Sequence, residues 1–201
     1  MSMVPQAVSS KVVFWRKTVL IQIEKALPTD VVTIAEMFDA LNDYLAANIN
    51  YPGWKKGIYP TREDADADVR MGLGYVARQG NETCGYIVLS SEPEASPVIG
   101  KWMVDASDNE VLSVHRFVVH PLFMRQGVGT QLLHFADAVA LRQSMKALRL
   151  DVYEKNIPAI RAYERHGYVY IDTVDIGLSQ YGLDKFHLYE KDLSRIHAGK
   201  T

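Results

Sequence analysis

The chain has 201 residues, of which 48% are hydrophobic and 23% are charged, so a single domain with a proper core is expected. A formal net charge of −2, with scattered lysines and arginines, argues against a nucleic-acid partner or an anionic membrane surface. Cys84 is the only cysteine, which excludes an intrachain disulfide and a metal site built on several thiolates. No apolar run approaches the roughly 20 residues of a membrane span.

The first residues, MSMVPQAVSS, show no secretory signal, because they lack a basic segment followed by a continuous apolar one. We therefore expect a cytoplasmic location. Residues 1–10 are expected to form a flexible tail and residues 11–201 a single domain.

Apolar periodicity predicts the elements of the first half of the chain. They are a strand at 19–26, a helix at 28–48, a Gly/Pro loop at 49–60 that carries Tyr51, Trp54 and Tyr59, a short helix at 62–72, and a β-hairpin at 73–90.

The second half begins with a connection at 91–110, whose length is typical of functional loops. The elements predicted after it are an apolar strand at 111–119, a helix at 127–144, a strand at 146–153, a helix at 157–167, and closing strands at 168–175 and 185–193. This mixed order of strands and helices indicates a three-layer α/β or α+β domain.

Two glycines, Gly127 and Gly129, stand where the strand at 111–119 gives way to a helix. A dinucleotide fingerprint would need glycine in place of Leu132, and a mononucleotide loop would need lysine in place of Thr130. The exposed amides of a helix N-terminus could still hold a phosphate, with Arg125 adding charge. An ordinary strand-to-helix turn eased by glycine is the alternative.

The wider sequence resembles the Gcn5-related N-acetyltransferase (GNAT) family. The resemblance rests on an apolar-x-Val-x-Pro strand end at 117–121, a glycine motif at 124–129, and an Asn-x-x-Ala-x-x-x-Tyr-x-x-x-Gly motif that runs from Asn156 to Tyr168. With the order of elements, it covers residues 19–193. Met124 departs from the motif, which has Gln or Arg at that position.

The resemblance implies the three-layer acyl-CoA N-acyltransferase fold, with helices on both faces of a mixed central sheet and a splay between its fourth and fifth strands. It implies acetyl-CoA as co-substrate. Separately, we expect no metal, because His115 and His120 have opposite strand parity and cannot form a two-histidine site. The pyrophosphate would lie on the amides of a loop, and the pantetheine arm would pair with a strand edge and with Asn156. The loop and strand residues so implied are Arg125, Gln126, Gly127, Val128, Gly129 and Thr130, and Phe117, Val118 and Val119.

The resemblance also assigns catalytic roles. Tyr163 matches the tyrosine that protonates the departing coenzyme A sulfur as general acid. Asp151 matches a catalytic glutamate of the ribosomal-protein N-terminal acetyltransferases, and His115, an imidazole in an apolar strand, is the rival general base. The Val119 backbone N–H could polarise the thioester carbonyl. Structural roles for these side chains remain open.

Aromatic residues outside the cofactor core could line an amine pocket, namely Trp54, Tyr59 and Trp102. We expect an acetyl-CoA-dependent N-acetyltransferase that acts on the primary amine of a small molecule by direct attack in a ternary complex. The alternatives are an acetyltransferase for peptide or protein N-termini and a non-catalytic acyl-CoA sensor. A homodimer is left open.

Overall fold

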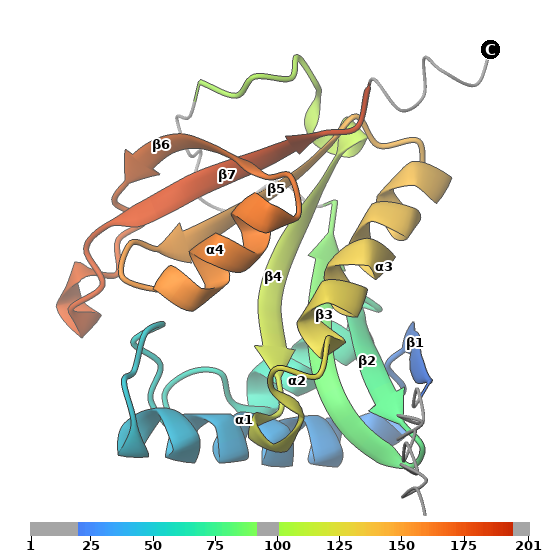
Figure 1. The fold of residues 1–201 in the computed structure, drawn as a ribbon, viewed down its shortest axis with the longest axis vertical. Helices are drawn as coiled ribbons and strands as arrows, with labels where there is room; N and C mark the ends of the chain where they lie inside the picture. The colour runs from blue at the N-terminus through green and yellow to red at the C-terminus, as the bar shows by residue number, and fades with distance from the viewer. Residues whose placement is uncertain (1–19, 92–100, 195–201) are drawn as a thin grey trace, which may run out of the picture.

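The computed structural model describes residues 20–91 and 101–194 (Figure 1), so the tail expected at 1–10 and part of the connection at 91–110 lie outside the described residues. The strands are β1 (Ile21–Lys25), β2 (Gly74–Gln79), β3 (Glu82–Ser90), β4 (Val111–Val119), β5 (Ala147–Tyr153), β6 (Val169–Val174) and β7 (Phe186–Asp192). The helices are α1 (Val31–Ala47), α2 (Arg62–Arg70), α3 (Val128–Arg142) and α4 (Ile157–Arg165). Every strand and helix predicted from the sequence within the described ranges is therefore confirmed.

The strands form one mixed sheet in the order β1-β2-β3-β4-β5-β7-β6, in which only β4 and β5 run parallel. These two strands pair only at their first three residues, from Val111↔Ala147 to Ser113↔Arg149. Beyond that point they diverge, as Figure 1 shows between the vertical β4 and the slanted β5. The splay expected between the fourth and fifth strands is thus present.

Helices cover both faces of the sheet, which gives the expected three layers (Figure 1). On one face, α1 and α2 pack on β2 and β3 in an apolar cluster that includes Ile34 and Phe38 of α1 and Tyr86 of β3. The helices α3 and α4 bury a second cluster on the opposite face, centred on Leu132 and Leu148. None of the helices among the described residues has the length and apolar character needed to cross a membrane.

A β-bulge interrupts β4 in the part of the strand that has separated from β5. Tyr86 pairs with Val118 and Val88 with His115, so one residue of β3 faces both Arg116 and Phe117. Arg116 has a left-handed φ of 41°, which is unusual for a residue other than glycine. The bulge shifts the alternation of side chains: Val114 and Phe117 both belong to the α3 face, and Arg116 turns towards α2.

Candidate functional site

A cavity of about 990 Å³ opens where β4 and β5 have separated. Its walls come from the end of α1, the loop at 49–54, the turn after β4, the N-terminus of α3 and one side of α4. Of the residues expected to bind a cofactor, it is lined by Phe117, Val119, Arg125, Gly127, Val128, Gly129, Thr130 and Asn156. The structure thus gathers most of that set around one space.

The N-terminus of α3 faces this cavity. The first intrahelical bond runs from Gln131 N–H to the Gly127 carbonyl, at 3.0 Å, so the amides of the preceding three residues have no partner within the helix. Such amides, backed by the helix dipole, favour a bound anion.

The two glycines of the turn serve different needs. Gly127 caps the helix with φ 87°, and a Cβ placed on it would meet nothing within 4 Å. A Cβ on Gly129 would lie 3.1 Å from Phe117 Cζ, so this glycine lets α3 pack closely on β4. Both glycines line the cavity, and of the two only Gly127 has open space where a side chain would project.

The residues just before the two glycines have different environments, and that of Met124 accounts for its difference from the Gln or Arg of the family motif. Met124 packs on the apolar cluster under α1 and α2 while also lining the cavity. Gln126 donates its side-chain amide to the Leu122 carbonyl at 2.8 Å and does not line the cavity. Arg125 lines it with a left-handed φ of 61°. The only cationic side chain in this turn is therefore that of Arg125.

The edge of β4 beside the splay carries unpaired backbone groups. His120 N–H donates to the Cys84 carbonyl of β3 at 3.0 Å. Because amides alternate along a strand, Val119 N–H points the other way, towards the gap left by β5. Val118 is buried in the core under α1, so only its backbone could contribute to a site on that edge.

A second cavity, of about 460 Å³, continues through the splay to the other side of β4. The two cavities share five lining residues: Pro52, Trp54, Phe117, Asn156 and Ala159. Molecules in the two cavities would therefore meet at the bulged part of β4.

Asp151 and His115 both line the second cavity. They lie two residues beyond the Ser113↔Arg149 pair, so the register places them opposite each other where the strands part. Burial raises the pKa of the Asp151 carboxyl and lowers the pKa of the His115 imidazole, while their mutual attraction opposes both shifts. The two candidate bases, Asp151 and His115, are thus neighbours, and the charge of each affects the pKa of the other.

Tyr163 reaches the second cavity from α4. Its ring packs 5.7 Å from the rings of Phe117 and Tyr168, measured between centroids. Burial, reinforced by the Asp151 charge, raises the pKa of its phenol, which therefore stays protonated at neutral pH. No group among the described residues hydrogen-bonds its hydroxyl, which leaves the proton available to a bound molecule.

The outer wall of the second cavity is mostly apolar. Trp54 and Tyr59 pack edge to face with centroids 5.5 Å apart, and the opposite side comes from the loop between β6 and β7, with Leu178, Tyr181 and Leu183. The backbone of Gly53 touches the Leu183 side chain so closely that a Cβ there would clash. The two loops therefore meet over the cavity.

Trp102 lies apart from both cavities. Its ring stacks under the Arg149 guanidinium at 4.3 Å, and Arg149 pairs with the buried Glu190 at 2.9 Å. Glu190 also accepts the backbone N–H groups of Met103 and Val104 at 2.8 and 3.0 Å. Trp102 thus helps to fasten the segment before β4 to the sheet.

Sequence reasoning did not identify the partner in the ion pair that holds the bulge. Arg116 pairs with Asp68 of α2, whose side chain is fully buried, and the Arg116 Nε lies 2.6 Å from Asp68 Oδ2. Asp68 Oδ2 also accepts the Tyr86 hydroxyl at 3.1 Å. The only signal in the sequence was an aspartate on the apolar side of a short helix.

This three-layer fold, split between β4 and β5 with the N-terminus of α3 beside the gap, defines an acyl-CoA N-acyltransferase architecture. Solved structures share it. An acetyltransferase of the GNAT family from Streptococcus agalactiae 2603 has a TM-score of 0.64 at 21% identity, covering 86% of this chain and 95% of that one. The protein yncA from Salmonella typhimurium, solved with its cofactor acetyl-CoA, has a TM-score of 0.61 at 16% identity, covering 86% and 94%. The ribosomal-protein-S18-alanine N-acetyltransferase from Escherichia coli has a TM-score of 0.62 at 14% identity, covering 87% and 95%.

The sequence also matches the model of the acetyltransferase (GNAT) family over residues 35–168. The chain belongs to that family and is an acyltransferase. The GNAT family uses acetyl-CoA, and the resemblance stated from the sequence is confirmed.

Proposed function

We propose that this protein transfers the acetyl group of acetyl-CoA to a primary amine of a small molecule, by direct attack within a ternary complex. The observation that carries the proposal is the meeting of two cavities at Phe117 and Asn156. One cavity suits the cofactor and the other an acceptor, so the two substrates can react without a covalent enzyme intermediate.

The larger cavity suits coenzyme A. The amides of Val128, Gly129 and Thr130 would hold the pyrophosphate, with the Arg125 guanidinium beside them. The free edge of β4, with the Val119 N–H, would pair with the pantetheine arm and polarise the thioester carbonyl. A long arm laid along that edge leads from α3 towards the shared residues of the two cavities.

Asp151 and His115 supply the base. The amine must lose a proton before or as its nitrogen attacks the carbonyl carbon, and a carboxyl with a raised pKa is a better base than an ordinary one. His115, kept neutral by burial, is the second acceptor for that proton. As the carbon–sulfur bond breaks, Tyr163 donates its phenolic proton towards the departing sulfur.

Closure of the second cavity favours a small acceptor over a peptide. A peptide N-terminus would need an open groove between the loops at 49–60 and 175–184, and those loops touch at Gly53 and Leu183. The wall that they form is lined by Trp54, Tyr59 and Tyr181. These side chains suit an amine with an apolar or aromatic tail, whose ammonium group could contact a ring face before it is deprotonated.

The test is release of free thiol from acetyl-CoA in the presence of separate acceptors: primary aryl-alkyl amines, polar diamines, and a short peptide with a free α-amine. We expect turnover with the apolar amines and an acetylated product detected by mass spectrometry. Turnover on the peptide alone would replace the small-molecule proposal with N-terminal acetylation. Binding of acetyl-CoA without turnover on any acceptor would favour a sensor.

A further inference from the structure

Three side chains with metal-binding atoms converge on the outer side of α3, away from the reacting residues. His134 and Asp137 lie three positions apart on α3, and His166 follows the end of α4. One ligand atom from each lies within 4.8 Å of the others. Residues at i and i+3 share a helix face, so α3 presents its two together.

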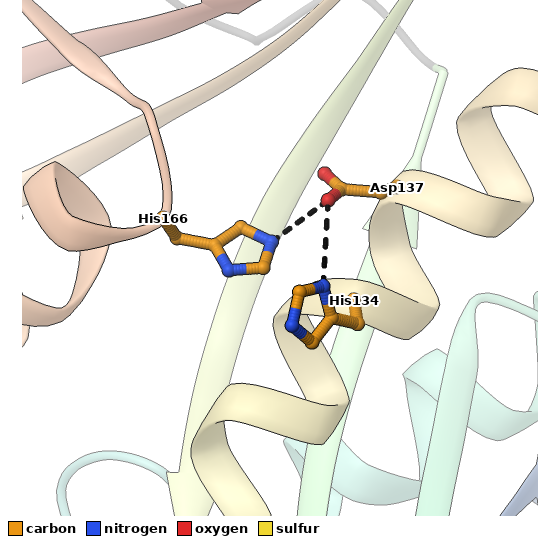
Figure 2. Close-up of side chains that lie close together, drawn as sticks. All are labelled: His134, Asp137 and His166. Atoms are coloured by element: carbon orange, nitrogen blue, oxygen red, sulfur yellow. Dashed lines mark hydrogen bonds and ion pairs between the residues drawn. The ribbon is translucent and has the colours of Figure 1, made fainter.

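Both imidazoles point at the same carboxylate oxygen (Figure 2). His166 Nε2 lies 2.8 Å from Asp137 Oδ2, and His134 Nδ1 lies 4.0 Å from that oxygen. The two rings meet edge to face with centroids 4.5 Å apart. The three polar atoms therefore surround one small volume between α3 and the end of α4.

We propose that His134, Asp137 and His166 bind a divalent transition-metal ion, with Zn²⁺ as the preferred occupant. Two imidazoles and one carboxylate form a ligand set suited to zinc, whereas Mg²⁺ and Ca²⁺ favour oxygen ligands. Bonds of about 2.0–2.2 Å place the ligand atoms of a tetrahedral zinc site roughly 3.4 Å apart. The two observed separations, 2.8 and 4.0 Å, lie on either side of that value.

The surroundings allow the small movements that this geometry needs. The His134 side chain is 68% exposed and can swing inwards, while His166 and Asp137 are largely buried, at 7% and 19%, and stay in place. The exposed side leaves a fourth position for water, as in zinc sites with three protein ligands.

Lys191 lies beside the cluster and carries a positive charge. Its Nζ lies 2.8 Å from Asp137 Oδ1 and 2.7 Å from Oδ2. Metal binding requires the ammonium to withdraw from Oδ2 and to keep its bond to Oδ1. A carboxylate held in this way by its second oxygen is oriented towards the metal, as is usual for metal-bound carboxylates.

A metal here would tie two walls of the cofactor cavity together. The N-terminus of α3 lines that cavity, and so do Arg165 and His166 at the end of α4. Neither Asp151 nor Tyr163 belongs to the cluster, so the metal would act as a clamp between helices and would take no part in acetyl transfer. The inference therefore does not depend on the proposed acceptor.

The test is calorimetric titration of the full chain, freed of metal by a chelator, with Zn²⁺. We expect one equivalent to bind and to raise the melting temperature, because a ligand that binds only the folded state stabilises it. His134→Ala should weaken binding at least about tenfold. This exposed residue can be replaced without disturbing the core. The matched control His187→Ala should keep the wild-type affinity, since His187 lies beside Tyr170 and outside the cluster.

A second measurement separates specific ligation from general effects on stability. Co²⁺ bound by two imidazoles and a carboxylate should give visible absorption that His134→Ala reduces and His187→Ala leaves unchanged. No binding up to millimolar Zn²⁺ would overturn the proposal. Equal affinity in wild type and His134→Ala would overturn it as well, because the ion would then lie elsewhere.

Discussion

Replacing Tyr163 with phenylalanine should slow acetyl transfer and leave the fold and the cofactor site intact. The hydroxyl has no hydrogen-bond partner among the described residues, so its removal leaves no buried group unsatisfied. Tyr163 lines the acceptor cavity and not the cofactor cavity. We therefore expect kcat to fall while KM for acetyl-CoA stays unchanged.

The expected loss follows from the proton affinities of the two groups. General acid catalysis by one side chain contributes about 10²- to 10⁴-fold, or about 2.7–5.4 kcal/mol. A thiol has a pKa of about 8.5 and a phenol about 10, and burial raises the phenol of Tyr163 further. Full transfer of its proton to a thiolate is thus uphill by at least about 2 kcal/mol. Tyr163 then acts mainly as a hydrogen-bond donor to developing charge, which predicts a loss of about 10²-fold.

The assay is thiol release from acetyl-CoA at saturating amine, and Tyr168→Phe is the matched control. The Tyr168 ring lies 5.7 Å from that of Tyr163, but its buried hydroxyl has no partner among the described residues and Tyr168 lines neither cavity. Tyr168→Phe should keep kcat and gain about 1 kcal/mol of stability, because it removes an unsatisfied buried polar atom. Equal losses in the two variants would show that the effect is not specific to the Tyr163 hydroxyl and would refute the acid role. Full activity in Tyr163→Phe would refute it directly.

Three further predictions concern the base and the cofactor turn. Asp151→Asn should lower kcat about 10²-fold or more, yet raise the melting temperature at pH 7. The raised pKa of Asp151 means that the folded state holds this proton more tightly than the unfolded one, so stability falls as pH rises from the ordinary value of 3.8 through the folded value. A melting temperature at pH 7 below that of wild type in calorimetry would contradict this. Gly129→Val should raise KM for acetyl-CoA about tenfold or more, because the new Cβ would lie 3.1 Å from Phe117 Cζ and displace that ring. Unchanged cofactor affinity in a binding titration would contradict a role for this turn in cofactor binding. Arg125→Gly should gain about 1 kcal/mol of stability by relieving its left-handed φ of 61° and should bind acetyl-CoA more weakly, with a flatter salt dependence. An unaltered salt dependence would exclude Arg125 from phosphate binding.

Local signals in the sequence were sufficient to predict the elements and the glycine turn. Apolar periodicity located the helices, and the glycine turn after a buried strand marked the N-terminus of α3. These features depend on neighbours within a few residues of one another, which is the range over which propensity and capping act. The position of Trp102 depends on a distant partner instead, because its ring stacks under Arg149, 47 positions along the chain.

The relation between Asp151 and His115 depends on register, which periodicity does not specify. As sequence, they were two competing candidates on separate strands. The short parallel pairing that ends at Ser113↔Arg149 places them opposite each other, and each then shifts the other's proton affinity. Asp151 and His115 therefore titrate together, with pKa values that cannot be assigned to one residue alone. Variants at the two positions should be analysed together.

The bulge in β4 is the feature on which the site depends most and which the sequence could least predict. Strict alternation along 111–119 would place Arg116 on the α3 side, in the apolar core. A left-handed φ at this arginine instead turns it to Asp68, a fully buried carboxylate on α2. Breaking a buried pair of this kind costs about 3–5 kcal/mol, more than the 1–2 kcal/mol of a left-handed residue, so the ion pair can hold the strained backbone in place. The same irregularity places Phe117 at the junction of the two cavities, which makes α2 a remote support for the proposed acetyl-transfer site.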